Sequence, residues 1–407
     1  MRILFSHNKF PSQFRRLLPF FEQLGCDIRF ISSSVEWNAP KSLLKYNTLY
    51  YVPSHTQYSL IHPYLRPFEH SVLEGQSAFR ACHEFSEENW YPDYIISHAG
   101  FGNGFYLSDV FPDAKHLKLF EWYYNPVNSD VDFLNQSHPG DLDLSPRVKT
   151  LNSTTLLDFA SCDVRIVPTN WQHSQFPDYL RPLIHVIHEG IDHSHLSRLR
   201  NTPSKPSFLP SDPNLQFITY VSRGFEEYRG FPQAVQAISR LLISHPNLHA
   251  ILVGSDIVAY GKVRDDGRSW KSWAMDELHS VSNRVHWAGS VSNNEYESIL
   301  SISDVHLYLT VPFILSWSLL EAMASKCPIV ASDTPPVTEV LVHNRNSLLV
   351  NFFDVDQIVK SVSKLLSDKA LSRHISQQAS IDSIPYDCDQ GCLSWFQLMK
   401  SDDAPAV

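Results

Sequence analysis

The chain contains no uninterrupted apolar run that approaches the roughly 20 residues of a membrane-spanning helix. Its N-terminus, Met-Arg-Ile-Leu-Phe-Ser-His, turns polar too early for a signal peptide, so we expect a cytoplasmic protein without a membrane span. Peripheral contact with a membrane stays open. An excess of positive charge is also missing: the net charge of -10 over 407 residues argues against general nucleic-acid binding.

Cysteine is scarce, and the six cysteines include no Cys-x-x-Cys pair. Cys388 and Cys392 have no matching pair that would complete a zinc pattern, so scattered reduced thiols are the simplest interpretation. Four histidines cluster in the sequence at His185, His188, His193 and His195. Their spacing fits no common zinc pattern, and we expect neither a metal nor a cofactor.

The chain length suggests two domains at about 100–200 residues each. The first opens as strand, helix and strand at Arg2–Ser6, Phe14–Leu24 and Cys26–Ile31, which is the unit of a parallel sheet covered by helices. Further strands are predicted at Tyr94–Ser97, Leu117–Phe120 and Val164–Pro168. Residues 35–90, rich in aromatics and proline, allow no assignment.

A proline-rich stretch, Arg200–Asn214, carries four prolines and predicts an inter-domain linker. Strands and helices then alternate clearly. Strands are predicted at Leu215–Val221, His249–Val253, Arg284–Trp287, Val305–Thr310 and Pro328–Ser332, and helices at Phe231–Ile243, Glu295–Ile302, Ser318–Ser325, Val355–Leu366 and Ala370–Ala379. The predicted division is residues 1–199, a linker at 200–214, residues 215–380, and a C-terminal segment 381–407 whose helix near Leu393–Met399 can cross back to the first domain.

Two arginines follow the first strand of the second half. Arg223 ends that strand and Arg229 precedes the next helix. Ligands of open parallel sheets bind at the carboxyl edge, and two guanidinium groups on one such loop suit a diphosphate. The alternative is that both are surface arginines paired with Glu226 and Glu227.

A helix start near residues 315–318 offers a second anion site. After the strand that ends at Thr310, the backbone N–H groups of Leu315, Ser316, Trp317 and Ser318 are free to bind phosphate. Glu321 follows one turn later, where its carboxylate can accept both hydroxyls of a ribose. The alternative is that Ser318 and Glu321 form an ordinary capping box.

In this order, these residues resemble the donor-binding domain of the family 4 retaining glycosyltransferases, whose pattern is Arg-x5-Lys, a Val-x-Phe-x-Gly strand, and Glu-x7-Glu followed by Ala-Met. Arg223 matches the arginine, and Arg229 stands at the position of the lysine. Val285–Val291 matches the strand near the base, Leu320–Ala324 the second half of the acidic motif, and Asp333–Glu339 the stretch that follows. The resemblance implies an α/β fold of the GT-B type: two Rossmann-like domains with parallel sheets facing a central cleft.

The first half resembles a bacterial subgroup of the same enzymes through His7–Phe14, Ser97–Gly102, Phe120–Tyr124, Pro168–Gln172 and His188–Asp192. The resemblance implies that His98 points at the donor sugar and diphosphate; the alternative is a partly buried histidine with satisfied hydrogen bonds. Glu121 and Tyr123 lie in an aromatic run that suits an acceptor sugar or, equally, an interface core. Gln13, from the first matched stretch, is a further acceptor-side candidate.

Three departures from the family stand out. Position 313, where the family has the glutamate that holds the transferred sugar, is Phe313. The family's Phe-Gly pair has Ser316 in place of glycine, and residues 7–14 lack the glycines of many relatives. Diphosphate and ribose binding, with Val291 near the base, carry over better than sugar recognition.

The sequence thus predicts a retaining glycosyltransferase of polysaccharide biosynthesis that moves a hexose-type sugar from a nucleoside diphosphate, UDP favoured and GDP next, to a glycan or glycolipid. Arg223 and Arg229 would stabilise the departing diphosphate without a metal ion. A nucleotide-sugar 2-epimerase and a catalytically silent sugar-nucleotide-binding or scaffold protein, suggested by Phe313, are the alternatives. A dinucleotide dehydrogenase is disfavoured because no Gly-x-Gly-x-x-Gly follows the first strand.

Overall fold

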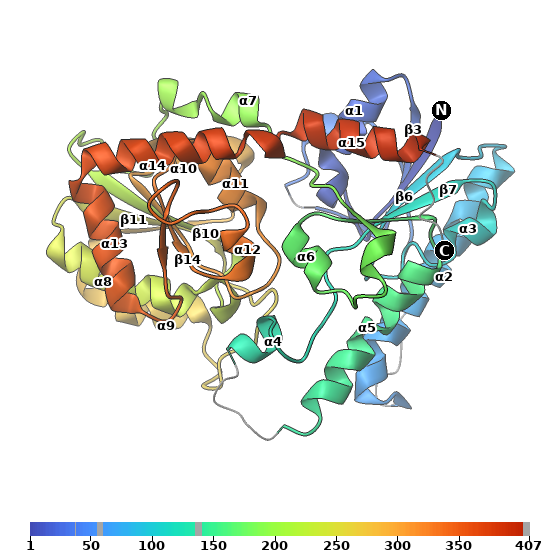
Figure 1. The fold of residues 1–407 in the computed structure, drawn as a ribbon, viewed down its shortest axis with the longest axis horizontal. Coiled ribbons are helices and arrows are strands. Elements are labelled where there is room, and N and C mark those ends of the chain that lie inside the picture. The colour runs from blue at the N-terminus through green and yellow to red at the C-terminus, as the bar shows by residue number, and fades with distance from the viewer. Residues whose placement is uncertain (37, 55–59, 135–140, 402–407) are drawn as a thin grey trace. The chain divides into compact units, whose positions relative to one another are not determined.

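The chain divides into two units, Met1–Gly190 with Cys388–Val407 and Ile191–Asp387. The structure, a computed structural model, describes residues 1–36, 38–54, 60–134 and 141–401 (Figure 1). The division differs from the predicted one because residues 200–214 lie inside the second unit. There Arg200 donates to the Ser325 carbonyl oxygen (3.0 Å) and Leu209 is buried in a core cluster. Residues 402–407 of the predicted C-terminal segment lie outside the described residues.

The first unit is built on a seven-stranded sheet in the order β5-β3-β1-β6-β7-β8-β9. Every neighbouring pair is parallel, as expected from the strand–helix–strand opening. The strands are β1 (Arg2–Ser6), β3 (Asp27–Ser32), β5 (Asn47–Tyr50), β6 (Tyr94–His98), β7 (Lys115–Leu119), β8 (Val164–Val167) and β9 (Ile184–Val186). A separate short parallel pair joins β2 (Lys9–Phe10) to β4 (Ser34–Val35).

The helices of this unit are α1 (Leu17–Gln23), α2 (Arg66–Glu87), α3 (Leu107–Val110), α4 (Asp130–Phe133), α5 (Leu144–Ala160), α6 (Asn170–Ser174) and α15 (Cys388–Lys400). The predicted helix Phe14–Leu24 is in fact a 3-10 turn, Ser12–Arg15, followed by α1. The long helix α2 lies in the stretch that allowed no assignment. The buried residues of its first half, Ser71, Glu74 and Gly75, are small or polar, so the apolar stripe that marks a helix in sequence is confined to its second half.

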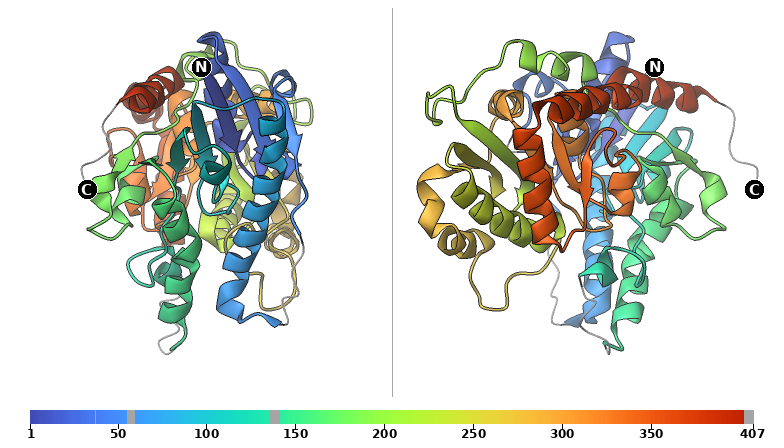
Figure 2. Two further views of the ribbon diagram at one scale, coloured as in Figure 1. Left: turned by 90° about the vertical axis from the view of Figure 1, so that its right-hand side faces the viewer. Right: turned by 60° about the vertical axis from the view of Figure 1, so that its left-hand side comes forward.

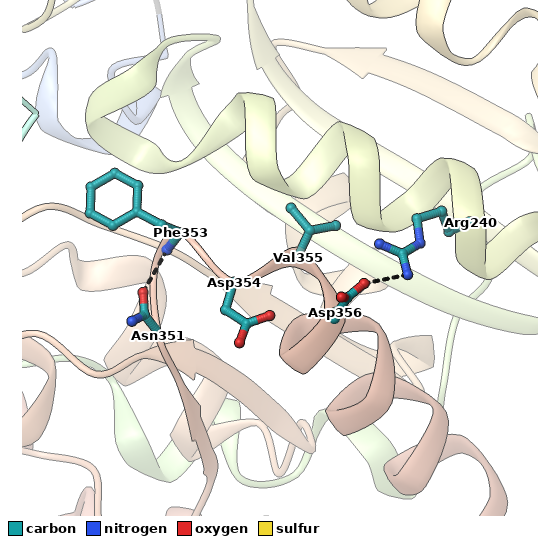
Figure 3. Close-up of a pocket in the computed structure, with 6 residues that line it drawn as sticks. All are labelled: Arg240, Asn351, Phe353, Asp354, Val355 and Asp356. Atoms are coloured by element: carbon teal, nitrogen blue, oxygen red, sulfur yellow. Dashed lines mark hydrogen bonds and ion pairs between the residues drawn. The ribbon is translucent and has the colours of Figure 1, made fainter. Parts of the chain in front are cut away.

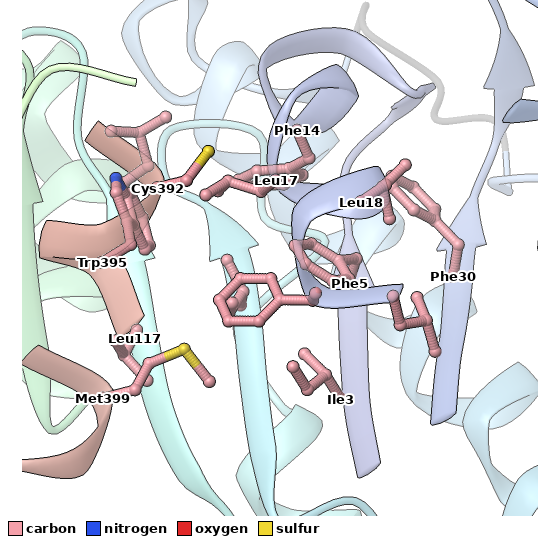
Figure 4. Close-up of a cluster of buried hydrophobic side chains, with 14 of the residues drawn as sticks. Ile3, Phe5, Phe14, Leu17, Leu18, Phe30, Leu117, Cys392, Trp395 and Met399 are labelled. Carbon is pink, nitrogen blue, oxygen red and sulfur yellow. The ribbon is translucent and has the colours of Figure 1, made fainter. Parts of the chain in front are cut away.

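The C-terminal helix α15 completes the core of the first unit (Figure 4). Its Trp395 is 0% exposed, and Cys392 and Met399 belong to the same cluster as Phe5 and Leu117 of the sheet. Burying a tryptophan and its neighbours against β-strand side chains supplies the apolar contact that holds this helix on the unit.

The second unit has a six-stranded parallel sheet in the order β12-β11-β10-β13-β14-β15. Its strands are β10 (Gln216–Gly224), β11 (Leu248–Ser255), β12 (Val285–Gly289), β13 (Val305–Tyr308), β14 (Ile329–Ser332) and β15 (Leu348–Val350). All but β15 were predicted. Helices surround this sheet (Figure 2): α7 (His193–Leu196), α8 (Phe231–Ser244), α9 (Trp270–Glu277), α10 (Asn293–Ile302), α11 (Trp317–Ala324), α12 (Pro335–Thr338), α13 (Val355–Ser367) and α14 (Lys369–Asp382).

Because each sheet is parallel, the carboxyl ends of its strands meet at one edge, where the loops that follow them can form a site. The predicted donor-side residues lie at the end of β10 and after β10, β12 and β13 of the second unit, and His98 ends β6 of the first. Across the described part of the chain, no helix combines the length and the apolar character needed to cross a membrane.

Candidate active site

Arg229 is buried at the carboxyl edge of the second sheet, only 8% exposed. Its Nη1 donates to Thr310 Oγ1 (2.8 Å), to the Ile314 carbonyl oxygen (3.1 Å) and to the Tyr308 hydroxyl (3.5 Å). No carboxylate of the described residues lies within ion-pair distance of it. The groups that contact this guanidinium are neutral, and the Glu226 carboxylate acts on it only through space, so an anionic ligand would be bound favourably here.

The backbone around Arg229 depends on a glycine. The chain passes from β10 through a 3-10 turn, Glu227–Arg229, to Gly230, whose φ is +61°, and then into α8. A Cβ added at Gly230 would lie 2.5 Å from the Leu309 Cβ. A side chain at this position is therefore excluded both by the left-handed backbone and by the strand loop beside it.

The sequence left open that the two arginines pair with Glu226 and Glu227. In the structure, Glu226 forms an ion pair with neither arginine. This carboxylate is completely buried, and its Oε2 accepts the backbone N–H groups of Ala259 (3.2 Å), Tyr260 (2.9 Å) and Gly261 (2.7 Å). Glu226 thus fixes the loop after β11, and its charge acts on Arg229 only through space. Burial raises the pKa of the neighbouring Glu227 carboxyl.

Arg223 differs from Arg229 in its exposure and in its contacts. It is exposed at the end of β10 and forms no hydrogen bond or ion pair with any residue in the described ranges. One cation of the predicted pair is therefore rigidly held, and the other is a long side chain with rotamer freedom. The second can adjust to a ligand but pays side-chain entropy to do so.

The start of α11 is capped by Ser316, not by Ser318. The Ser316 Oγ accepts the Ser318 N–H (3.3 Å) and lies 2.9 Å from the Ser318 Oγ, while the Ser316 N–H donates to the Tyr308 hydroxyl (3.0 Å). The third helical residue is consequently Leu319, so the Ser318–Glu321 capping box is wrong. Glu321 is half-buried one turn into the helix.

The remaining donor-side residues contribute differently. Leu315 is buried in the core cluster that contains Leu319, so only its backbone can meet a ligand. Val291 is half-buried and packs against another core cluster, which leaves little of its side chain for a base. Trp317 is half-buried at the first position of α11.

Phe313 lies between two tyrosine rings. Its ring centroid is 5.6 Å from that of Tyr228 and 5.2 Å from that of Tyr260, and the side chain is 5% exposed. A phenylalanine at this position therefore belongs to an aromatic cluster that the surrounding residues are built to accept.

In the first unit, Gln13, His98 and Glu121 come together at the carboxyl edge of β6. The His98 Nε2 is 3.3 Å from Glu121 Oε2, and the Gln13 Nε2 donates to Glu121 Oε1 (2.8 Å). The ring of His7, which the sequence did not single out as a site residue, is 4.8 Å from that of His98. Burial, with the neighbouring His98, lowers the pKa of His7 well below its usual value, so His7 is neutral at pH 7.

Tyr123 does not join this group. Its ring lies 5.3 Å from Phe176 and packs on a core cluster of the first unit. The two sets of site residues lie in different units: Arg229 and the start of α11 in the second, and Gln13, His98 and Glu121 in the first.

The clustered histidines have separate partners: His193 contacts the Ser380 carbonyl oxygen (2.9 Å) and His195 contacts Glu297 (2.9 Å). A pocket of about 490 Å³ on the second unit is lined by none of the predicted site residues (Figure 3). Its lining consists of Arg240, Asn351, Phe353, Asp354, Val355 and Asp356.

Comparison with known families also separates the chain into two parts. Residues 25–196 match the glycosyl transferase family 4 group, and residues 202–381 match glycosyl transferases group 1. The chain is a glycosyltransferase. As a glycosyltransferase it is an enzyme, and the matched stretches contain all the predicted site residues except Gln13.

Solved structures show that this glycosyltransferase has the GT-B fold. It resembles a UDP-forming α,α-trehalose-phosphate synthase from Burkholderia xenovorans (TM-score 0.70, 14% identity, 100% of this chain and 99% of the other covered). It also resembles Anabaena HepE in complex with UDP-glucose (TM-score 0.68, 16% identity, 98% and 99% covered).

Among curated proteins, an exopolysaccharide phosphotransferase of Streptomyces coelicolor is 35% identical over 82 residues. That match covers 20% of this glycosyltransferase and 9% of the relative, so the chain spans only a small part of the relative's length.

Proposed function

We propose that this glycosyltransferase transfers a hexose-type sugar from a nucleoside diphosphate sugar to a glycan or glycolipid acceptor with retention of configuration, with UDP favoured over GDP as the nucleotide. The observation that carries the proposal is the buried Arg229, which has no carboxylate partner in the described part of the chain and lies at the carboxyl edge of a parallel sheet. A diphosphate would supply the missing negative charge.

In the proposed reaction, the residues of the second unit act on the leaving diphosphate. The bond between the anomeric carbon and the diphosphate oxygen breaks, and its electron pair stays on the diphosphate. Arg229, Arg223 and the first N–H groups of α11 stabilise that charge as it develops. The acceptor hydroxyl oxygen bonds to the anomeric carbon on the same face, and its proton passes to the leaving phosphate. Phe313 cannot act as a nucleophile, so the proposal includes no covalent enzyme intermediate.

In the first unit, we assign His98 to the donor sugar and Gln13 and Glu121 to the acceptor side. The His98 imidazole is held by the contact of its Nδ1 with the Ala99 carbonyl oxygen (2.7 Å), Glu121 lies beside its Nε2, and Gln13 holds that carboxylate. The UDP-glucose complex of HepE and the UDP-forming synthase support a uridine nucleotide, and the exopolysaccharide relative supports a glycan acceptor.

The direct test is binding of nucleotides. A thermal-shift screen of UDP, GDP, ADP and their sugars should raise the melting temperature with UDP compounds most, because a ligand stabilises in proportion to RT ln(1 + [L]/Kd). Acceptor-independent hydrolysis of the stabilising sugar nucleotide should then release the free diphosphate. No shift with any of the nucleotides would refute the proposal.

Glu321→Gln is expected to raise the Kd for the nucleoside diphosphate about 10- to 150-fold, since a charge-assisted contact to a ribose hydroxyl contributes roughly 1.5–3 kcal/mol. Isothermal calorimetry measures this change. Glu277→Gln, at an exposed position at the end of α9, is the control and should leave Kd unaltered. Equal affinity of Glu321→Gln and the parent protein would remove Glu321 from the site.

Phe313→Glu is expected not to raise turnover with UDP-glucose, although it restores the residue type that relatives carry. The new carboxylate would be buried between the rings of Tyr228 and Tyr260, which costs roughly 1–3 kcal/mol or more of stability. Initial rates and the melting temperature check both parts. A strong gain in activity would instead show that the native site is a degraded form of the usual one.

A further inference from the structure

The loop between β11 and α9, residues 256–269, follows the carboxyl end of β11 and is anchored by the Glu226 side chain. One carboxylate oxygen accepts three consecutive backbone N–H groups, at positions 259 to 261. Three hydrogen bonds to one buried charge fix this part of the backbone more firmly than an ordinary turn. Tyr260 is the middle residue of this segment, so these hydrogen bonds fix the backbone position from which its side chain extends.

Tyr260 presents its ring between two features of the proposed donor site. Its ring centroid is 5.2 Å from that of Phe313 and 5.5 Å from the guanidinium carbon of Arg229. Phe313 is 5% exposed, whereas Tyr260 is 39% exposed. Beside Arg229, a ligand would therefore meet Tyr260 and not Phe313.

We propose that Tyr260 is a donor-sugar specificity residue, and that Glu226 is its positioning residue. The inference rests on the proposed function, because it takes Arg229 as the diphosphate site. A sugar attached to a diphosphate at Arg229 extends to the neighbouring surface, where Tyr260 offers an aromatic face for C–H groups and a hydroxyl that both donates and accepts. Phe313 supports that ring from behind. This arrangement fits a neutral pyranose, since a phenol supplies no charge to balance an acidic or amino sugar.

The test separates nucleotide binding from sugar binding. Calorimetry would measure the Kd of UDP and of UDP-glucose, UDP-galactose, UDP-N-acetylglucosamine and UDP-glucuronate, with GDP and GDP-mannose as the second nucleotide pair. The variants are then measured with whichever nucleotide of an uncharged sugar the parent protein binds most tightly. We expect Tyr260→Ala to weaken that sugar nucleotide about tenfold or more while changing the free diphosphate about threefold at most, so that the ratio of the two Kd values shifts.

Three further variants sharpen the result. Tyr260→Phe, which keeps the ring, should lose only the hydroxyl part of the effect. Val263→Ala changes a 76% exposed side chain of the same loop and should alter neither Kd. Glu226→Gln should shift the same Kd ratio as Tyr260→Ala, because a neutral amide cannot accept three N–H groups as a carboxylate does; a merely structural role would lower the melting temperature without moving the ratio.

The outcomes are distinguishable. If the parent protein binds neither free diphosphate nor any sugar nucleotide, the proposed function fails. If it binds them and Tyr260→Ala weakens both equally or neither, the role of Tyr260 is overturned while the diphosphate site stands. Preferred binding of UDP-glucuronate would also overturn the inference, because it requires a cation where the structure has a phenol.

Discussion

Replacing Arg229 with alanine is expected to lower kcat about 10²- to 10³-fold while raising the donor KM much less. Its Nη1 is fixed by three neutral oxygens, so the guanidinium is held in place before the diphosphate carries its full charge. An interaction that strengthens as charge develops on the leaving group stabilises the transition state more than the bound substrate. Steady-state kinetics with saturating acceptor measures the split between kcat and KM.

Arg223→Ala should act in the same direction but more weakly, because Arg223 is exposed and must be ordered by the ligand. The double variant should lose less than the product of the single effects, since both cations serve one leaving group. Arg240→Ala, which removes an exposed ion pair with Asp356 on the same unit, is the matched control and should keep full activity. An effect of Arg229→Ala confined to KM is incompatible with the mechanism.

Asp158→Ala is expected to destabilise the first unit by about 3–5 kcal/mol, because it leaves Lys118 buried without a counter-charge. Both side chains are completely buried, and Lys118 Nζ lies 2.7 Å from Asp158 Oδ1. The second oxygen, Oδ2, accepts the Gly100 N–H (2.8 Å) two residues after His98. The substitution therefore also frees the loop that follows His98.

Urea unfolding followed by fluorescence checks this effect as a shift of the transition assigned to the first unit. Asp141→Asn, which breaks the exposed ion pair with Arg147, is the control and should produce no measurable shift. The double variant Lys118→Met with Asp158→Leu should recover much of the lost stability, because well-packed apolar residues often replace a buried pair at little cost. An Asp158→Ala protein as stable as the parent would show that water reaches Lys118.

Short apolar runs that alternate with segments of helical periodicity were sufficient to predict nearly all strands of the second sheet. Buried parallel strands are continuous apolar runs, and α8 carries its apolar residues at helical spacing. The strand β15 (Leu348–Val350) was missed because three residues are too few to show a period. Helix α2 was missed because small and polar residues occupy the buried face of its first half, and only its second half shows apolar residues at helical spacing.

By itself, the sequence determined the parallel α/β character of both units and the positions of Arg223, Arg229 and Glu321 near strand and helix ends, because these follow from local order along the chain. Only the tertiary structure decided what surrounds them. It placed Glu226 on the backbone of residues 259–261, Tyr260 over Phe313, and His7 beside His98. These contacts join side chains from loops that are distant in sequence, and no local pattern encodes a contact that exists only once the strands have paired.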